Sequence, residues 1–134
     1  MPNPHLEQLT PDQLQALLDS LPVPVFVKHP DGAVMLVNKA WEASMGIALA
    51  DLAGSDGEGV FPPEQIAEFH ARDAEAREKQ LTISYNETYW SPRHGANRLG
   101  QTTKRFLFDD DGHALFLVGT TLDMTEQLQL QKLV

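Results

Sequence analysis

Two Asp-Gly turns, each between apolar runs, restrict the fold of this chain more than any other feature. The first is Pro30-Asp31-Gly32 and the second is Asp109-Asp110-Asp111-Gly112. Glycine accepts the positive φ that such tight turns require, so each turn is typical of a β-hairpin. The four strands of these two hairpins are expected at residues 23–28, 33–37, 98–108 and 114–122.

A fifth strand is predicted at residues 81–90, where side chains alternate between two kinds. Its inward face is expected to carry Leu81, Ile83, Tyr85, Glu87 and Tyr89. The intervening side chains are threonine, serine and asparagine. The strands at 98–108 and 114–122 have no clean polar face, so both faces of the sheet must be covered.

The N-terminal helix is predicted at residues 11–21. Thr10 and Gln13 form the pattern of a capping box, and Pro11 stands at the first helical position, where its missing N–H costs little. An apolar stripe then follows at helical spacing. It comprises Leu14, Leu17, Leu18 and Leu21.

Two further helices are expected in the middle of the chain. Asn38 is a good N-cap for a helix ending near Met45. The longer helix, at residues 63–79, is expected to bury Ile66 and Phe69 and to expose its charged residues. Its alanines at 67, 71 and 74 are expected on the buried side, and Asp73 among the solvated residues.

These elements predict an α+β fold: a five-stranded antiparallel sheet with the middle helices on one face and the N-terminal helix on the other. We divide the chain into four parts by residue range. They are a flexible arm at 1–10, an amphipathic helix at 11–22, a core at 23–123 and the start of a C-terminal linker helix at 124–134.

The order of four short motifs resembles the PAS sensor domain over about Asp19 to Glu126. The motifs are the Pro30-Asp31-Gly32 hairpin, Asn38-x-x-Trp41, the acidic Asp-Gly turn and Asp123-x-Thr125-Glu126. The resemblance implies a sensory module of a signal-transduction protein that binds a small ligand or a partner. The alternative is a ligand-free dimerisation or protein-interaction module.

Composition excludes several other classes of function. The net charge is −9, with 10 basic residues scattered along the chain, so we expect no contact with nucleic acid. No apolar run is long enough to span a membrane, and we expect a cytoplasmic location. Cysteine is absent, and no motif of nucleophilic or metal catalysis occurs. An enzyme using Glu87 or Asp73 as base lacks a second catalytic group, so we expect no enzymatic activity.

Haem and flavin are not expected as cofactors. Some PAS proteins bind haem through a histidine that Asp follows directly, on the helix corresponding to residues 63–79. Here Arg72 precedes Asp73, so the matching position is Arg72 and not His70. The light-sensing branch of the family needs a cysteine that forms a flavin adduct, and the chain has none.

Candidate ligand-binding residues come from the expected inner face and from the resemblance. They are Asn38, Trp41, Phe69, His70, Tyr85, Glu87 and Arg105. Asn38 and Trp41 are either a cap and a core aromatic or residues of a cavity mouth. Glu87 needs a partner if it is buried. Lys104 or Arg105 would supply one, either as an ion pair at the sheet edge or within a polar patch of a cavity.

Asp123, Thr125 and Glu126 match the element through which PAS domains pass their signal. Asp123 and Glu126 have the spacing of a capping box for a helix that continues through Leu128, Leu130, Leu133 and Val134. This helix is either a frayed end or a linker to an output domain, such as a histidine kinase, a cyclic-dinucleotide enzyme or a transcription regulator. We also expect a homodimer through helix 11–21, extended by Leu6 and Leu9.

Overall fold

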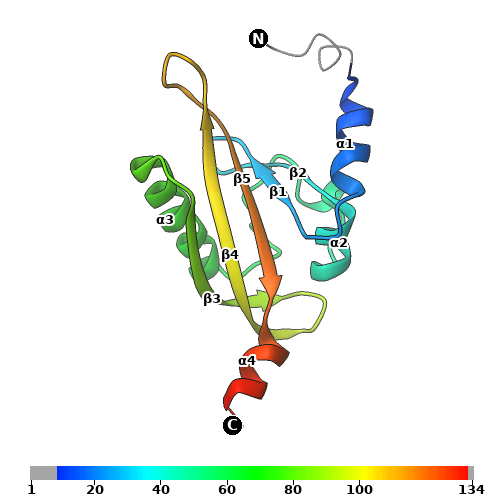
Figure 1. Ribbon diagram of the computed structural model, residues 1–134. Coiled ribbons are helices and arrows are strands. Elements are labelled where there is room, and N and C mark those ends of the chain that lie inside the picture. The colour runs from blue at the N-terminus through cyan, green and yellow to red at the C-terminus, as the bar shows by residue number, and fades with distance from the viewer. Residues whose placement is uncertain (1–8, 133–134) are drawn as a thin grey trace.

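A computed structural model describes residues 9–132 of the protein (Figure 1). Most of the predicted arm, including Leu6, lies outside these residues, as do Leu133 and Val134. The elements in chain order are α1 (Pro11–Asp19), β1 (Phe26–Lys28), β2 (Val34–Val37), α2 (Lys39–Met45), η2 (Leu49–Asp51), α3 (Pro63–Lys79), β3 (Ile83–Ser91), β4 (Ala96–Phe108), β5 (Ala114–Asp123) and α4 (Thr125–Lys132). The α+β prediction is therefore confirmed.

The five strands form one antiparallel sheet in the order β2-β1-β5-β4-β3. Both hairpins close through the predicted turns. Asp31 accepts a hydrogen bond from the backbone N–H of Ala33 (2.9 Å). Asp109 accepts from the N–H groups of Asp111 and His113 (2.9 and 2.8 Å). These side chains replace backbone partners within the turns, which stabilises the reversal of the chain.

Strand β1 lies inside the sheet, next to the edge strand β2, and pairs with both β2 and the central strand β5. Phe26 lies opposite Gly119, whose missing side chain makes room for the phenyl ring. A Cβ atom at Gly119 would collide with the ring of Phe26, so any larger residue here requires the ring to move. The Phe26 ring lies on the inner face of the sheet, in the core cluster against which Ile66 and Phe69 of α3 pack.

Helix α1 begins with the predicted capping box. Thr10 accepts from the N–H of Gln13 (3.1 Å), and the N–H of Thr10 donates to the Gln13 side chain (2.9 Å). The helix ends at Asp19, two residues before the predicted end. The C-terminal cap is formed by Ser20, whose N–H reaches back to the last turn.

The position of α1 differs from the prediction that it covers the outer face of the sheet. It packs beside α2 (Figure 1), and Leu14, Leu17 and Leu21 remain 49%, 56% and 42% exposed. The physical reason is a set of bonds to the start of α2. The side-chain amide of Asn38 donates to the carbonyl of Leu18 (2.9 Å), and Asp19 accepts from the N–H of Lys39 (2.9 Å).

Helix α3 lies against the inner face of the sheet, but its buried side differs from the predicted one. Asp73 and Ala76 are buried, whereas the alanines at 67, 71 and 74 are exposed. Phe69, Asp73 and Ala76 follow one another at helical spacing and define one face. The prediction that Asp73 is solvated was wrong, because the spacing of apolar residues does not reveal where a carboxylate is buried.

Candidate functional site

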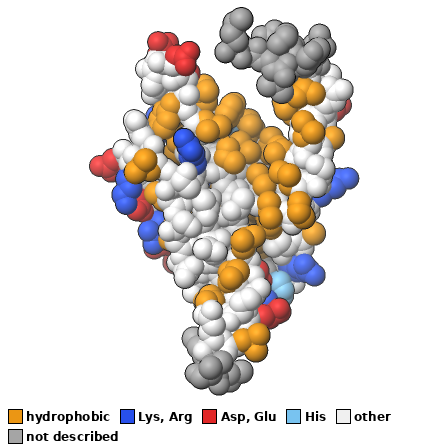
Figure 2. Space-filling model, in the orientation of Figure 1, with side chains coloured by type: hydrophobic (Ala, Val, Ile, Leu, Met, Phe, Trp, Pro, Cys, Tyr) orange, Lys and Arg blue, Asp and Glu red, His pale blue; other side chains and the backbone are white. Residues whose placement is uncertain are grey.

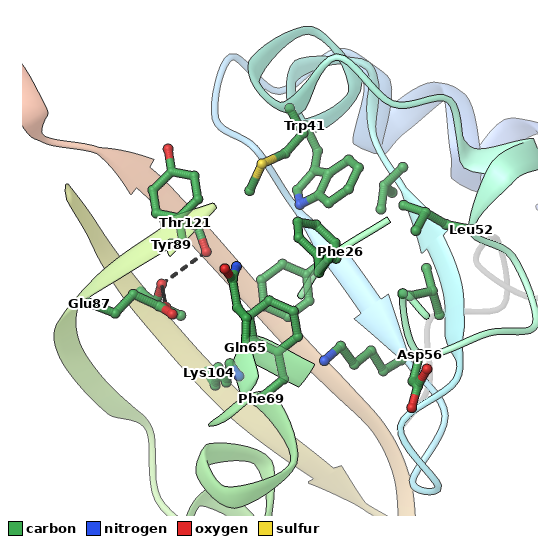
Figure 3. Close-up of a pocket in the computed structure, with 17 residues that line it drawn as sticks. Phe26, Trp41, Leu52, Asp56, Gln65, Phe69, Glu87, Tyr89, Lys104 and Thr121 are labelled. Carbon is green, nitrogen blue, oxygen red and sulfur yellow. Dashed lines mark hydrogen bonds between the residues drawn. The ribbon is translucent and has the colours of Figure 1, made fainter. Parts of the chain in front are cut away.

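A cavity of about 60 Å3 lies between the inner face of the sheet, α3 and the segment around α2 and η2 (Figure 3). Most of its wall is apolar. The principal apolar side chains are Phe26, Trp41, Leu52, Phe61, Phe69 and Tyr89. Phe61 and Phe69 meet edge to face with ring centroids 5.4 Å apart, an arrangement that aromatic pairs favour.

A buried ionic triad forms one pole of this cavity. One oxygen of Asp73 accepts from the ammonium of Lys28 (3.1 Å), and the other accepts from that of Lys104 (2.7 Å). The Lys104 side chain is only 2% exposed. Burial therefore lowers the pKa of Lys104, although the neighbouring Asp73 acts in the opposite direction.

Both ammonium groups of the triad also face aromatic rings. The Lys28 nitrogen lies 5.0 Å from the centre of the Phe69 ring, and that of Lys104 lies 5.7 Å from it. The Phe26 ring lies 5.7 and 5.9 Å from the same two nitrogens. Cation–π attraction offsets part of the loss of hydration that these charges incur on burial.

Glu87 marks the opposite pole. It accepts a hydrogen bond from the hydroxyl of Thr102, which also lies 2.9 Å from the hydroxyl of Thr121. Glu87 makes no ion pair with Lys104 or Arg105 among the described residues, so the predicted pairing was wrong. Arg105 is exposed, because Lys104 and Phe106 take the inward positions and Arg105 points to the outer face. It does not line the cavity.

Gln65 of α3 was not among the predicted site residues, yet it points into the cavity (Figure 3). Its side-chain oxygen accepts from the backbone N–H of Trp90 (2.6 Å). This bond fixes the orientation of the amide, because the opposite orientation would set two donors against each other. The Nε2 atom is consequently buried with no hydrogen-bond partner in the described protein.

Asn38 and Trp41 have different surroundings. Asn38 is completely buried, and its side chain bonds the N–H groups of Trp41 and Val25 (3.0 and 2.9 Å) and the carbonyls of Leu18 and Val23 (both 2.9 Å). All its polar atoms are therefore used to join α1, β1 and α2. Trp41 lines the cavity, whereas Asn38 does not.

The remaining candidates are Phe69, His70 and Tyr85. Phe69 lines the cavity. His70 lies outside it, where its Nε2 bonds Asp56 (2.9 Å), and this bond from His70 lowers the pKa of Asp56. Tyr85 lies beside the triad, and the guanidinium carbon of Arg72 lies 4.3 Å from the centre of the Tyr85 ring. Its hydroxyl is buried without a partner among the described residues, and burial raises its pKa.

A haem group does not fit this arrangement through His70, because the imidazole faces Asp56 and not the cavity. The absence of haem and flavin stays a prediction. We expect the purified domain to be colourless. An absorption spectrum after desalting checks this, and a Soret band or a retained flavin band would contradict it.

The end of β5 is joined to α4 by a compact polar cluster. Asp123 accepts from the N–H and the hydroxyl of Thr125 (3.0 and 2.6 Å) and from Arg98 (2.8 Å). The Thr125 hydroxyl accepts in turn from the N–H of Leu99 (2.8 Å). Partial burial acts to raise the pKa of Asp123, but the bonds from Thr125 and Arg98 prevail, and its pKa is lowered.

The predicted capping box between Asp123 and Glu126 is not formed. Asp123 bonds the N–H two residues ahead, and Glu126 lies 3.7 Å from Arg98 on the surface. Helix α4 starts at Thr125, so Asp123 lies one residue too early to serve as its N-cap. The cluster therefore fixes the junction through Arg98 of β4 as well as through the chain itself.

The order of the strands, the inner cavity and the polar cluster that joins β5 to α4, called the exit cluster below, together define a PAS-type α+β domain. A family model described as the PAS fold matches residues 18–129, so the chain belongs to the PAS family. No curated protein sequence matches it significantly. Within the described part of the chain, no helix is long and apolar enough to cross a membrane.

Several solved structures have the same fold. The PAS domain of Bordetella pertussis BvgS is 21% identical, with 97% of this chain and 93% of that chain covered and a TM-score of 0.72. VqmA of Vibrio cholerae, solved with a ligand and DNA, is 23% identical, with 87% and 52% covered and a TM-score of 0.70. At these identities the likeness concerns the fold alone.

Sequence reasoning missed the triad and Gln65. Lys104 shares the inward phase of Thr102 and Phe106, and Asp73 lies one helical turn beyond Phe69. Those two periodicities would have placed Lys104 and Asp73 on facing surfaces. Lys28 gives a weaker signal, because strand β1 has only three residues.

Proposed function

We propose that this domain is a sensory module that binds a small ligand in its cavity and passes the bound state to a C-terminal output domain. The observation that carries the proposal is that strand β5 contributes residues both to the cavity and to the junction with α4. Thr121 lines the cavity, and Asp123, two residues later on the same strand, anchors α4. A ligand that moves Thr121 would therefore act directly on the exit.

The hydrogen-bonded chain across the sheet supports this route. Glu87 of β3, Thr102 of β4 and Thr121 of β5 are connected through their side chains. Arg98 and Asp123 connect β4 to β5 again at the exit. A ligand shifts such a system only by binding two arrangements of the sheet with different affinity. Two arrangements of this network would give the exit cluster two different geometries.

Suitable output domains are a histidine kinase or a cyclic-dinucleotide enzyme. Since VqmA has been solved with both a ligand and DNA, a transcription regulator is a third form of the same arrangement. Asp123, Thr125 and Glu126 are proposed as relay residues in each case. The domain itself then has no catalytic role.

Two-dimensional NMR of the 15N-labelled domain with a set of small metabolites tests the proposal. We expect a binding metabolite to shift resonances of the cavity wall and of residues 123–126 together. Thr121→Ile fills space within the cavity and should abolish both sets of shifts. Thr120→Ile, on the opposite face of β5, is the matched control. Binding at the cavity without any change at residues 123–126 would contradict the relay.

A second candidate is a ligand-free dimerisation module, and the exposed apolar surface favours it. Hydrophobic side chains gather along α1 and over the neighbouring part of the sheet (Figure 2). They include Leu14 and Leu17 of α1, Leu21 just after this helix, and Leu107 and Leu122 of the sheet. Surfaces of this kind commonly mark protein interfaces. If metabolites never reach the cavity but the protein dimerises, this second function is favoured.

A further inference from the structure

The hydrogen bonds of the hydroxyl groups beside Glu87 have a defined direction. Thr102 donates its single hydroxyl proton to Glu87, so it can only accept in its other contact, with Thr121. Thr121 must therefore donate to Thr102, and its oxygen can act only as an acceptor toward a ligand. The second carboxylate oxygen of Glu87 has no hydrogen-bond partner among the described residues. Glu87 and Thr121, which both line the cavity, thus offer a ligand acceptors and no donors.

Gly100 is the residue around which these two acceptors and an aromatic ring come together. It lies opposite Glu87 in the pairing of β3 with β4, and it has no side chain to fill the space beside that carboxylate. A Cβ atom at Gly100 would lie 2.9 Å from the ring of Tyr89 and 3.1 Å from the methyl group of Thr121. Glu87, Tyr89 and Thr121 therefore lie close together at this pole of the cavity (Figure 3).

The negative charge of Glu87 has no counter-ion in this part of the protein. Glu87 is half-buried, and it forms no ion pair among the described residues. Lys104 lies four residues beyond Gly100 on β4, where it bonds Asp73. A carboxylate that is partly removed from water without a counter-ion is costly, so a cation at this pole would be stabilised. The face of an aromatic ring, such as that of Tyr89, also attracts cations.

The size of the cavity and the number of acceptors restrict that cation further. The cavity volume of about 60 Å3 is less than half of the roughly 150 Å3 of an engineered cavity that binds benzene, so a ligand has only a few non-hydrogen atoms. A primary ammonium group carries three N–H donors and can bond both acceptors at once. A quaternary ammonium group carries none, and both acceptors would stay without partners.

We propose that the cavity binds a small primary alkylammonium ion at its Glu87 pole, of the size of methylammonium or ethylammonium. Its N–H groups donate to the free oxygen of Glu87 and to Thr121, and the ring of Tyr89 attracts its charge. This inference rests on the proposed ligand-sensing function and specifies the ligand of the same cavity.

The same glycine lies beside the exit cluster. On its other side, Gly100 pairs with Asp123 of β5. Burial, followed by the nearby charge of Asp123, raises the pKa of Tyr89 to about 12, so the phenol stays neutral at physiological pH. An ammonium ion over Gly100 would therefore bind next to the strand position that holds Asp123.

NMR titration of the 15N-labelled domain with methylammonium and ethylammonium chloride tests the proposal, with sodium chloride keeping the ionic strength constant. Ethanol, which has nearly the size of ethylammonium without its charge, and acetate, which has the opposite charge, are the matched probes. We expect saturable shifts at Glu87, Tyr89, Gly100 and Thr121 with at least one ammonium ion. Ethanol should bind at least tenfold more weakly, and acetate should not bind there.

Variants then assign the contacts. Glu87→Gln keeps the size of the side chain and an acceptor for Thr102 but removes the charge, so it should weaken ammonium binding at least tenfold. Thr121→Val keeps the shape of the side chain but removes the second acceptor, and it should weaken binding several-fold. Glu78→Gln, at an exposed position on α3, makes the same charge change and should bind as the parent does. If Glu87→Gln fails to fold by circular dichroism, Thr121→Val decides the question.

The outcomes distinguish this inference from the function beneath it. If neither ammonium ion gives saturable cavity shifts but ethanol, acetate or another metabolite does, the ligand class is refuted and the sensory function stands. No cavity shift with any of these molecules, and none with the wider metabolite set, would refute both. Equal affinities for ethanol and ethylammonium would overturn the role of the charge. Equal ammonium binding by the parent and by Glu87→Gln would overturn the assignment of Glu87.

Discussion

Asp73 shows at the level of one residue how α3 is joined to the sheet. Its two oxygens each hold one buried lysine, and it is the only carboxylate that bonds them among the described residues. Removing one partner of a buried ionic cluster leaves an uncompensated charge. The free energy lost in this way is larger than the net stabilisation that the intact cluster provides. Asp73 therefore constrains the fold by holding β1 and β4 against α3.

We expect Asp73→Asn to lower the free energy of unfolding by about 3–5 kcal/mol, the range for breaking a buried pair from one side. Lys104→Met should cost less, because Lys28 still neutralises Asp73. Urea denaturation measures both. Glu75→Gln, on the solvent side of the same helix, is the control and should change stability little. If Asp73→Asn proves as stable as the parent, the triad is not buried as described.

Asp123 is the residue whose change should separate signalling from folding. Its bonds to Thr125 are each worth about 1 kcal/mol, small beside the roughly 5–15 kcal/mol of a whole domain. Asp123→Ala should therefore preserve the fold but loosen α4, seen as faster hydrogen exchange over residues 124–132. Asp110→Ala in the β4–β5 turn is the control. Unchanged protection in α4 would rule out a role for Asp123 in holding the exit.

The same carboxylate predicts a pH dependence with a defined sign. The pKa of Asp123 is lowered in the folded protein, so its contribution to stability is complete above the unfolded pKa of about 4. That contribution is lost as the pH falls through the lower folded value. Protection of α4 should therefore decline in acid for the parent and depend less on pH in Asp123→Ala.

At the scale of single elements, α1 provides the clearest test of association. Its exposed leucines would be buried by a second copy of the chain, and we expect a homodimer through this helix. Leu14→Glu with Leu17→Glu should give a monomer by light scattering. Ala16→Glu, on another side of α1, should leave the dimer intact. A monomeric parent protein at high micromolar concentration would contradict the prediction.

The elements also show which features a sequence reveals. Asp31, Asp109, Thr10 and Asn38 act on backbone groups within a few residues, so their turns and caps were predictable from local chemistry. The placement of α1 depends on distant bonds from Asn38, and local patterns do not contain it. The inward phase of Lys104 was readable, but its partner lies on another element.

At the scale of the whole molecule, the fold was predictable because hairpins and helices occur in an order typical of the PAS family. The candidate site was only partly predictable. Trp41, Phe69 and Glu87 line the cavity, whereas Arg105 lies on the other face of the sheet and His70 on the outside. Which face a polar residue takes depends on strand phase and pairing, and not on its chemistry alone.

The pairing of β1 with β5 also determines when the sheet can be completed. Strand β1 lies near the start of the chain, but one of the two strands that it pairs with is β5, near the end. Contacts between such distant segments form late, since a long loop must close first. During synthesis, the early hairpin must wait for almost the entire domain to leave the ribosome. Only then can Phe26 meet Gly119 and complete the part of the cavity wall that β1 supplies.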